Sequence, residues 1–202
     1  TSAKLEKVEL DGANLERIKL NDALLQEAKL TKANISKGKL SGADLSGADL
    51  SGANMKGTDF TGAKLTEVDL SRADLTESVL KNAQMKNSFL AGADIRNADL
   101  ENVNLEESDL SGAKLSKTNF QRANLKRANF HRSDLEHADL SRADLSQANL
   151  SGAKLSDANF SNTILSDADL SGADTTDTNF SDAKGLKKKE LNISNIRKYN
   201  FF

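Results

Sequence analysis

The sequence predicts an all-β fold in which a five-residue unit repeats to form a long coil. Every fifth residue from Leu5 to Phe180 is apolar, with the single exception of Thr175. The residue two positions before each of these is small or β-branched, and most often Ala. Ten of the twelve glycines stand directly before that small residue. Neither the helical period of 3.6 nor the strand period of 2 gives a five-residue repeat, so the pattern indicates a short extended stretch followed by a turn.

The repeating unit has five positions, which Ser41–Leu45 illustrates. Leu45 fills the core position and Ala43 the small position, and in extended backbone these two side chains point to the same side. Asp44 stands between them at the outer position, which is most often Asp or Asn and faces water. The other two residues occupy the first and second corner positions. Because Gly, Asn and Asp tolerate turn dihedrals, their frequency at the second corner position indicates where the chain turns.

Stacking of coils must supply the hydrophobic core, since one coil of such units is too small to enclose a core by itself. Thirty-six units follow one another from Thr1 to Phe180 without insertion or deletion, and the chain contains no Pro. The lack of Pro suits a structure in which nearly every backbone N–H group is hydrogen-bonded. We expect a polar substitution at Leu100 or Leu105 to cost several kcal/mol, because it buries an unpaired group, and the same change at Asp99 to cost little.

These units resemble those of the pentapeptide-repeat family, and the resemblance covers residues 1–183. It implies a right-handed quadrilateral β-helix, a solenoid of about nine four-sided coils with one unit on each side. The spacing of phenylalanines supports twenty residues per coil independently, because four of them differ by multiples of twenty: Phe60, Phe120, Phe160 and Phe180. We expect these four on one side, with Phe160 stacked on Phe180, and Phe130 elsewhere.

The repeat stops at Gly185, so we divide the chain into a β-helix over residues 1–183 and a C-terminal tail over residues 184–202. The tail either forms a short helix over the last coil or continues as a degenerate coil. The degenerate coil would place Lys189 at an inward position, so we expect a short C-terminal cap. The resemblance implies that such elements can join two copies. The chain is then a monomer or a homodimer, and the candidate dimerisation residues are Ile196, Tyr199, Phe201 and Phe202.

No catalytic or metal-binding motif is present in the sequence. There is no Cys, and the only histidines, His131 and His137, occupy outward positions on different sides. The Asp residues recur at the outer position, which is typical of a structural role and not of a paired acid and base. Because a filled core leaves no concave site, we expect no enzymatic activity, no cofactor, no metal and no small-molecule substrate.

The sequence contains neither an apolar run long enough to cross a membrane nor a signal peptide at Thr1. We therefore expect no membrane insertion, and a soluble, cytoplasmic protein is favoured. The resemblance extends to proteins of the periplasm and the thylakoid lumen as well. It suggests a bacterial source and includes many cyanobacterial proteins.

Charge is arranged in bands along the chain. Residues 1–183 carry a net charge of −7 and the remaining residues +5, which gives −2 in total. Residues 94–109 and 155–183 are acidic, and residues 114–142 between them are basic. Second corner positions supply a basic belt that consists of Lys117, Arg122, Arg127, Arg132 and Arg142. The belt could dock an acidic partner, but we favour the simpler interpretation that neighbouring bands of opposite sign relieve repulsion between coils.

Four outer positions hold apolar residues in place of polar ones: Leu24, Val79, Phe89 and Ile164. Single exposed apolar side chains are common on protein surfaces. Phe89 is the most unusual of the four, and we predict that it contacts a partner.

Two classes of function are favoured, and a structural or assembly role is also open if the N-terminal edge of the coil pairs end to end with another copy. The first is a non-catalytic binding or scaffold protein that recognises another protein through the outer faces of the solenoid. The second follows from the resemblance, since some members mimic DNA and regulate a type II topoisomerase, gyrase in particular. This chain departs from those members in its near-zero net charge, its basic belt and its lack of loop insertions. Direct binding of nucleic acid is disfavoured because the repeat region is acidic and poor in aromatic residues.

Overall fold

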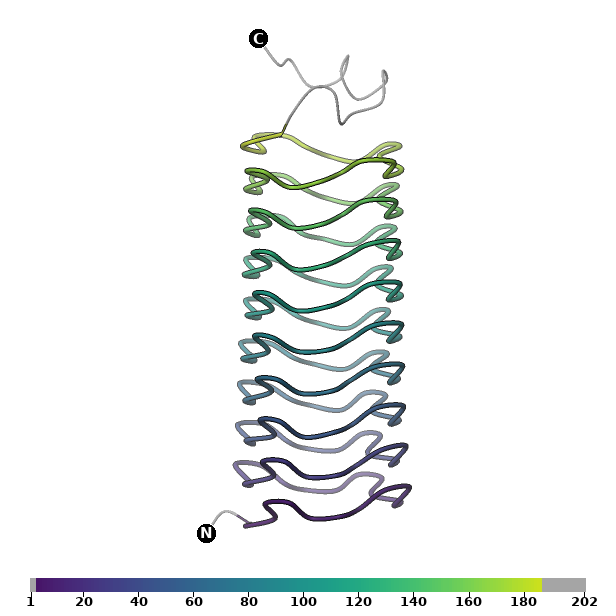
Figure 1. Ribbon diagram of the computed structural model, residues 1–202, viewed down its shortest axis with the longest axis vertical. Coiled ribbons are helices and arrows are strands. Elements are labelled where there is room, and N and C mark those ends of the chain that lie inside the picture. The colour runs from purple at the N-terminus through teal and green to yellow at the C-terminus, as the bar shows by residue number, and fades with distance from the viewer. Residues whose placement is uncertain (1–2, 187–202) are drawn as a thin grey trace.

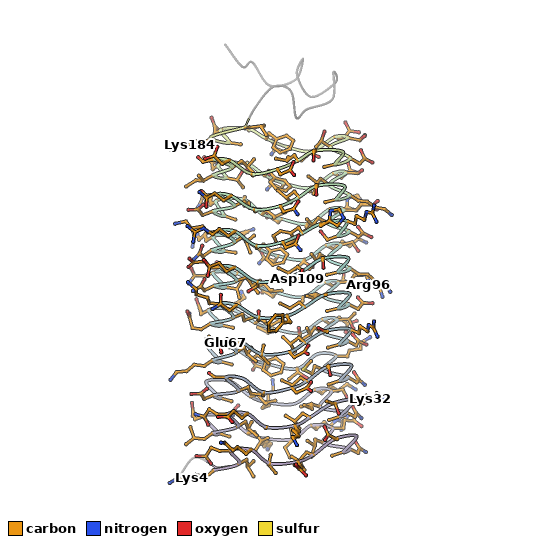
Figure 2. All side chains as sticks on the ribbon, viewed as in Figure 1. Lys4, Lys32, Glu67, Arg96, Asp109 and Lys184 are labelled. Carbon is orange, nitrogen blue, oxygen red and sulfur yellow. The ribbon has the colours of Figure 1, made fainter. Side chains whose placement is uncertain are left out.

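The computed structural model describes residues 3–186, which form a straight rod of stacked coils (Figure 1). Parallel bridges join each outer position to the one twenty residues later, from Lys4↔Leu24 to Ile164↔Lys184. Each coil therefore contains four units, which confirms the coil length that the phenylalanine spacing predicts. Lys4 and Lys184 lie on the same side at opposite ends of the rod (Figure 2), as expected for residues nine coils apart.

The sides of the coil are too short to form continuous strands. Within residues 3–186 the structure has no helix and no extended strand, and only the outer position of each unit makes a bridge. Three extended residues lie between one two-residue turn and the next, which leaves room for a single bridge per side. The four-sided coil is thus built from ladders of isolated bridges, while its right-handed sense stays a prediction.

Hydrogen bonds between coils engage three of the five backbone N–H groups in each unit. In the unit Ser46–Leu50, the second corner position and the core position donate to the following coil, and the outer position donates to the preceding one. These bonds are Gly47 N–Thr66 O at 2.9 Å, Leu50 N–Asp69 O at 2.7 Å and Asp49 N–Ala28 O at 2.9 Å. The same pattern recurs along the rod, so no coil can gain or lose a residue without breaking the ladder.

The two remaining N–H groups are satisfied inside the coil. The small position closes the turn, as in Ala48 N–Leu45 O at 3.0 Å. The first corner position donates to the side chain at the outer position two residues earlier, as in Ser46 N–Asp44 Oδ1 at 3.1 Å. The outer position is therefore most often Asp or Asn, because the oxygen of its side chain completes the backbone hydrogen bonding of the turn.

Asp99 illustrates how firmly such an outer residue can be held. Its carboxylate accepts hydrogen bonds from Glu101 N at 3.2 Å and Asn119 Nδ2 at 3.0 Å. Lys81 Nζ lies 3.0 Å from the other carboxylate oxygen. The expectation that a polar change at Asp99 costs little is consequently too broad. Asp99→Asn keeps a side-chain oxygen that can accept these hydrogen bonds. Asp99→Ser leaves the N–H groups of Glu101 and Asn119 without that acceptor.

Second corner positions all adopt the left-handed region of the backbone. From Lys7 to Asp182 their φ values lie between 52° and 69°. Only ten of these 36 residues are Gly, and no β-branched residue stands among them. The left-handed conformation crowds the Cβ atom, and most severely so in β-branched residues. The hydrogen-bonded ladder on both sides of each corner holds the other residues in this conformation.

The core is a column of side chains from the core and small positions, almost fully buried from Ala23 to Leu170. Phe160 stacks on Phe180 with ring centroids 5.4 Å apart, as expected. Phe130 lies on the side opposite Phe120, and the two rings meet edge to face across the core at 6.2 Å. Where Thr replaces Ala, its hydroxyl can donate to the preceding coil, as in Thr58 Oγ1–Ile35 O at 2.8 Å.

At the C-terminal end, the ladder reaches Lys184, and Leu186 packs against the core. The predicted cap and the candidate dimerisation residues lie outside the described residues: Ile196, Tyr199, Phe201 and Phe202. Both expectations therefore stay predictions.

Substituting Leu100 with Ala should lower the free energy of unfolding by about 2–5 kcal/mol. Leu100 is fully buried, and the stacked coils leave little freedom to close the cavity. Urea denaturation followed by circular dichroism measures the loss. Leu100→Met is the matched control, since Met55 and Met85 already occupy core positions, and it should cost less than about 1.5 kcal/mol. Equal losses for Ala and Met would contradict the proposed packing.

Substituting Gly62 with Ala should cost about 1–2 kcal/mol of stability. A Cβ atom at Gly62 meets nothing within 4 Å, so the cost comes only from its φ of 67°. Gly62→Asn should cost less, because Asn82 and Asn102 hold φ values of 59° and 58° at the same corner in the next two coils. Thermal denaturation of the three proteins compares them. An Ala variant as stable as the Gly protein would show that φ does not select Gly at this corner.

Candidate functional site

The outer surface of the rod offers sides and corners but no enclosed site. One depression on the described part of the rod has a volume of about 370 Å³, is open to solvent and is lined by Lys32, Ser51, Gly52, Ser71, Arg72 and Ala91. No group of three or more His, Cys, Asp or Glu residues within 3–186 is placed to hold a metal ion. None of the described residues belongs to a helix long and apolar enough to cross a membrane.

The two histidines lie at neighbouring corners and make ordinary surface contacts. His131 Nδ1 is 2.9 Å from Ser151 Oγ. His137 Nδ1 is 3.9 Å from Asp157 Oδ2, and both of these side chains are about half exposed. Both contacts are of the kind that surface side chains commonly make.

The basic belt encircles the rod and does not form one flat patch. Lys117, Arg122, Arg127 and Arg132 follow one another at intervals of five residues and therefore occupy four successive corners. Arg142 lies directly next to Arg122 at the same corner, one coil further on. A flat partner surface can reach one or two corners of a rod, but not all four at once. The five residues can therefore act together only on a partner that wraps around the coil.

Two of the belt residues form ion pairs with the acidic band that precedes them. Arg127 Nη1 lies 2.8 Å from Glu107 Oε1, and Arg122 Nη1 lies 3.8 Å from Glu101 Oε1. The hydrogen bond from Arg127, together with the nearby charge of Lys86, lowers the pKa of the Glu107 carboxyl. Within residues 3–186, the other three make no ion pair: Lys117, Arg132 and Arg142. The contacts of Arg122 and Arg127 agree with charge balance between coils.

Phe89 is the most exposed large apolar residue among those described, at 52% of its surface. Ile164 follows at 38%, and Leu24 and Val79 are half-buried. Leu24 and Ile164 share one side but lie seven coils apart, so the four apolar residues form no continuous patch. The bridges Asp69↔Phe89 and Phe89↔Asp109 place the Phe89 ring between two carboxylates.

A second apolar residue beside Phe89 escaped the sequence analysis. Ala91 is the only apolar residue at a first corner position from Thr1 to Ser181, and it lies in the unit that follows Phe89. Phe89 also lacks the oxygen with which an outer Asp or Asn accepts the N–H of the first corner position. The signal was available in the sequence, since both residues depart from the repeat within three positions of each other.

Replacing Phe89 with Asn should leave the rod as stable or raise its free energy of unfolding by up to about 1 kcal/mol. The Asn side chain restores an acceptor for the N–H of Ala91, as Asn129 does for His131 N at 3.1 Å. Thermal and urea denaturation measure the change. Phe89→Ser, whose side chain is too short to fill the same role, is the control. A marked loss of stability in Phe89→Asn would show that the ring supports the fold.

The sequence of the chain matches a known protein family. The model of the family described as pentapeptide repeats matches residues 9–47, 43–82, 73–112, 104–142 and 143–182, with eight copies. No curated protein matches the sequence.

Two solved structures are similar to the rod. One is HetL, a pentapeptide-repeat protein involved in heterocyst differentiation regulation in the cyanobacterium Nostoc sp. strain PCC 7120. Its sequence is 32% identical to this chain, the match covers 91% of this chain and 86% of HetL, and the TM-score is 0.52. QnrB1, a plasmid-mediated fluoroquinolone resistance protein, is 22% identical in one trypsin-treated form, with 94% of each chain covered and a TM-score of 0.65. The second likeness concerns the fold alone. From the family match and the similarity to HetL, the chain belongs to the pentapeptide-repeat family.

Proposed function

We propose that the protein is a non-catalytic binding rod that recognises another protein through its outer sides. The observation that supports this most strongly is the exposure of Phe89, the one aromatic residue at an outer position from Lys4 to Lys184, where Asp and Asn are the most common residues. A filled core and open, shallow surface depressions offer no place to enclose a small substrate. The coil is taken to be right-handed, as the family resemblance implies, and the rod acts as a monomer or as a homodimer joined by its C-terminal tail.

Site-specific photo-crosslinking tests this function on all four sides of the rod. The photoreactive residue p-benzoyl-phenylalanine replaces one outer residue on each side, namely Ile164, Phe89, Lys154 or Val79. We expect a covalent adduct with a second protein from at least one side, in the cells that produce the chain. Mass spectrometry of the adduct identifies the partner and the side that it covers. A complete lack of protein adducts from all four sides would overturn the proposal.

The alternative is a regulator of gyrase that acts by DNA mimicry. The acidic outer residues on the side of Phe89 favour it, because no Lys or Arg interrupts that column from Asp49 to Asp169. The basic belt argues against it, since it crosses all four corners within one coil. A gyrase supercoiling assay with and without a quinolone distinguishes the two functions. Inhibition or protection of gyrase at low micromolar protein would favour DNA mimicry over the proposed binding function. No effect on gyrase would leave the proposed binding function in place.

A further inference from the structure

The surface around Phe89 departs from the repeat in two ways that the fold does not require. Phe89 gives up a hydrogen bond at its turn, and its ring stays half exposed. Ala91 replaces the polar residue found at every other first corner position from Thr1 to Ser181. Together with Gly92, it adds no long side chain of its own to the corner beside the ring, where Arg72 of the preceding coil lies. An exposed aromatic ring is suited to contact with a partner.

The side of the rod that carries Phe89 is acidic from Asp49 to Asp169. Near the N-terminal end of the same side, Glu9 pairs with Lys29 at 2.8 Å. Figure 2 looks onto this side, with Asp109 near the middle of the view, Glu67 toward the left edge and Lys32 toward the right. In Asp49, Asp69 and Asp109, one oxygen accepts the N–H of the first corner position at 2.8–2.9 Å. Among the described residues, none of these three carboxylates forms an ion pair.

On the other three sides, some of the outer carboxylates meet cations. The nearest cation nitrogen lies 3.8 Å from Asp44, 2.7 Å from Asp94 and 3.0 Å from Asp99, and the partners are Lys64, Arg96 and Lys81. Among the described residues, outer carboxylates without an ion pair also occur on other sides, as at Asp74 and Asp139. The Phe89 side is set apart by the exposed ring that stands between two of them. Coils are about 4.8 Å apart, so Asp69 and Asp109 stand about 5 Å below and above the backbone of Phe89.

We propose that the Phe89 side of the rod binds a basic segment of another protein, with an Arg or Lys side chain over the Phe89 ring between Asp69 and Asp109. This inference rests on the proposed function and names the partner chemistry. A cation above an aromatic ring is attracted by the negative face of the ring, and two flanking carboxylates add to that attraction. Lys32 and Arg72 at the right-hand corner would repel the segment, which keeps it away from that corner.

Fluorescence anisotropy with a labelled twelve-residue peptide of alternating Arg and Ser tests the proposal. The wild-type rod should bind this peptide, more weakly as salt is added, and should not bind the peptide in which Glu replaces Arg. Phe89→Asn and Asp69→Asn should each weaken binding about fivefold. Both variants should fold, because Asn already occupies outer positions such as Asn129 on the same side.

Two variants serve as controls for nonspecific charge effects. Asp74 lies in the same coil as Asp69 on the next side, and its Oδ1 accepts Thr76 N at 2.9 Å, as Asp69 Oδ1 accepts Ser71 N at 2.8 Å. Asp74→Asn removes the same charge and should change the affinity less than about twofold. Arg72→Gly removes a cation beside the Phe89 side and should leave binding equal or tighter.

Several results would overturn this assignment. These are no binding by the wild-type rod, unchanged binding by Phe89→Asn, or an equal loss in Asp74→Asn and Asp69→Asn. Sedimentation that shows dimers of the wild type but not of Asp69→Asn would assign the side to a second copy instead. Photo-crosslinked adducts at Ile164, Lys154 or Val79 but not at Phe89 would support the proposed binding function. The same result would refute the assignment of binding to the Phe89 side.

Discussion

The hydrogen bonds between successive coils are the constraint on which the rest of the structure depends. Each coil offers its N–H and C=O groups to neighbours twenty residues away, so the number of residues per coil cannot vary. This explains why the units follow one another without insertion and why Pro is absent, since four of the five N–H groups in a unit bond to another backbone group. The fifth takes its acceptor from the outer Asp or Asn. The chain folds although it is poor in apolar residues, because this register stacks its apolar side chains into one column.

Because the fold specifies most positions of the unit, information about partners must lie in departures from the repeat. Core and small positions are fixed by packing, outer positions by the turn hydrogen bond, and second corner positions by their positive φ. A charged residue at a corner, such as Arg132, conforms to these rules and needs no partner to explain it. Phe89 breaks the rule for its position, and Ala91 breaks the rule for the first corner position a few residues later. Their coincidence on one side gives them more weight than any single charge.

Much of this architecture could be predicted from the sequence, because its period is strict and its phenylalanines mark the coil length. The contact between Phe120 and Phe130 was missed because residues ten apart meet across the coil, which the search for twenty-residue spacing does not reveal. The anchoring of Asp99 was missed because the outer position was seen only as water-facing, while its hydrogen bonds to the turn depend on backbone geometry. The partner could not be predicted, since the repeat pattern describes the inside of the rod and leaves the outside to side chains that the core does not constrain.

Outer carboxylates without an ion pair occur on several sides of the described rod, but beside Phe89 two of them flank an exposed aromatic ring. Several cations at corner or outer positions pair with an acid in a neighbouring coil, as in Arg127–Glu107 and Lys64–Asp44. The column from Asp49 to Asp169 contains no such cation, although 28 Lys and Arg residues are available in the chain. Repulsion between Asp49 and Asp69 in adjacent coils goes unrelieved, which opposes the stacking that holds the rod together. A surface that keeps like charges next to an exposed aromatic ring gives up stability in the isolated protein. A basic partner would restore it, since binding supplies the missing cations.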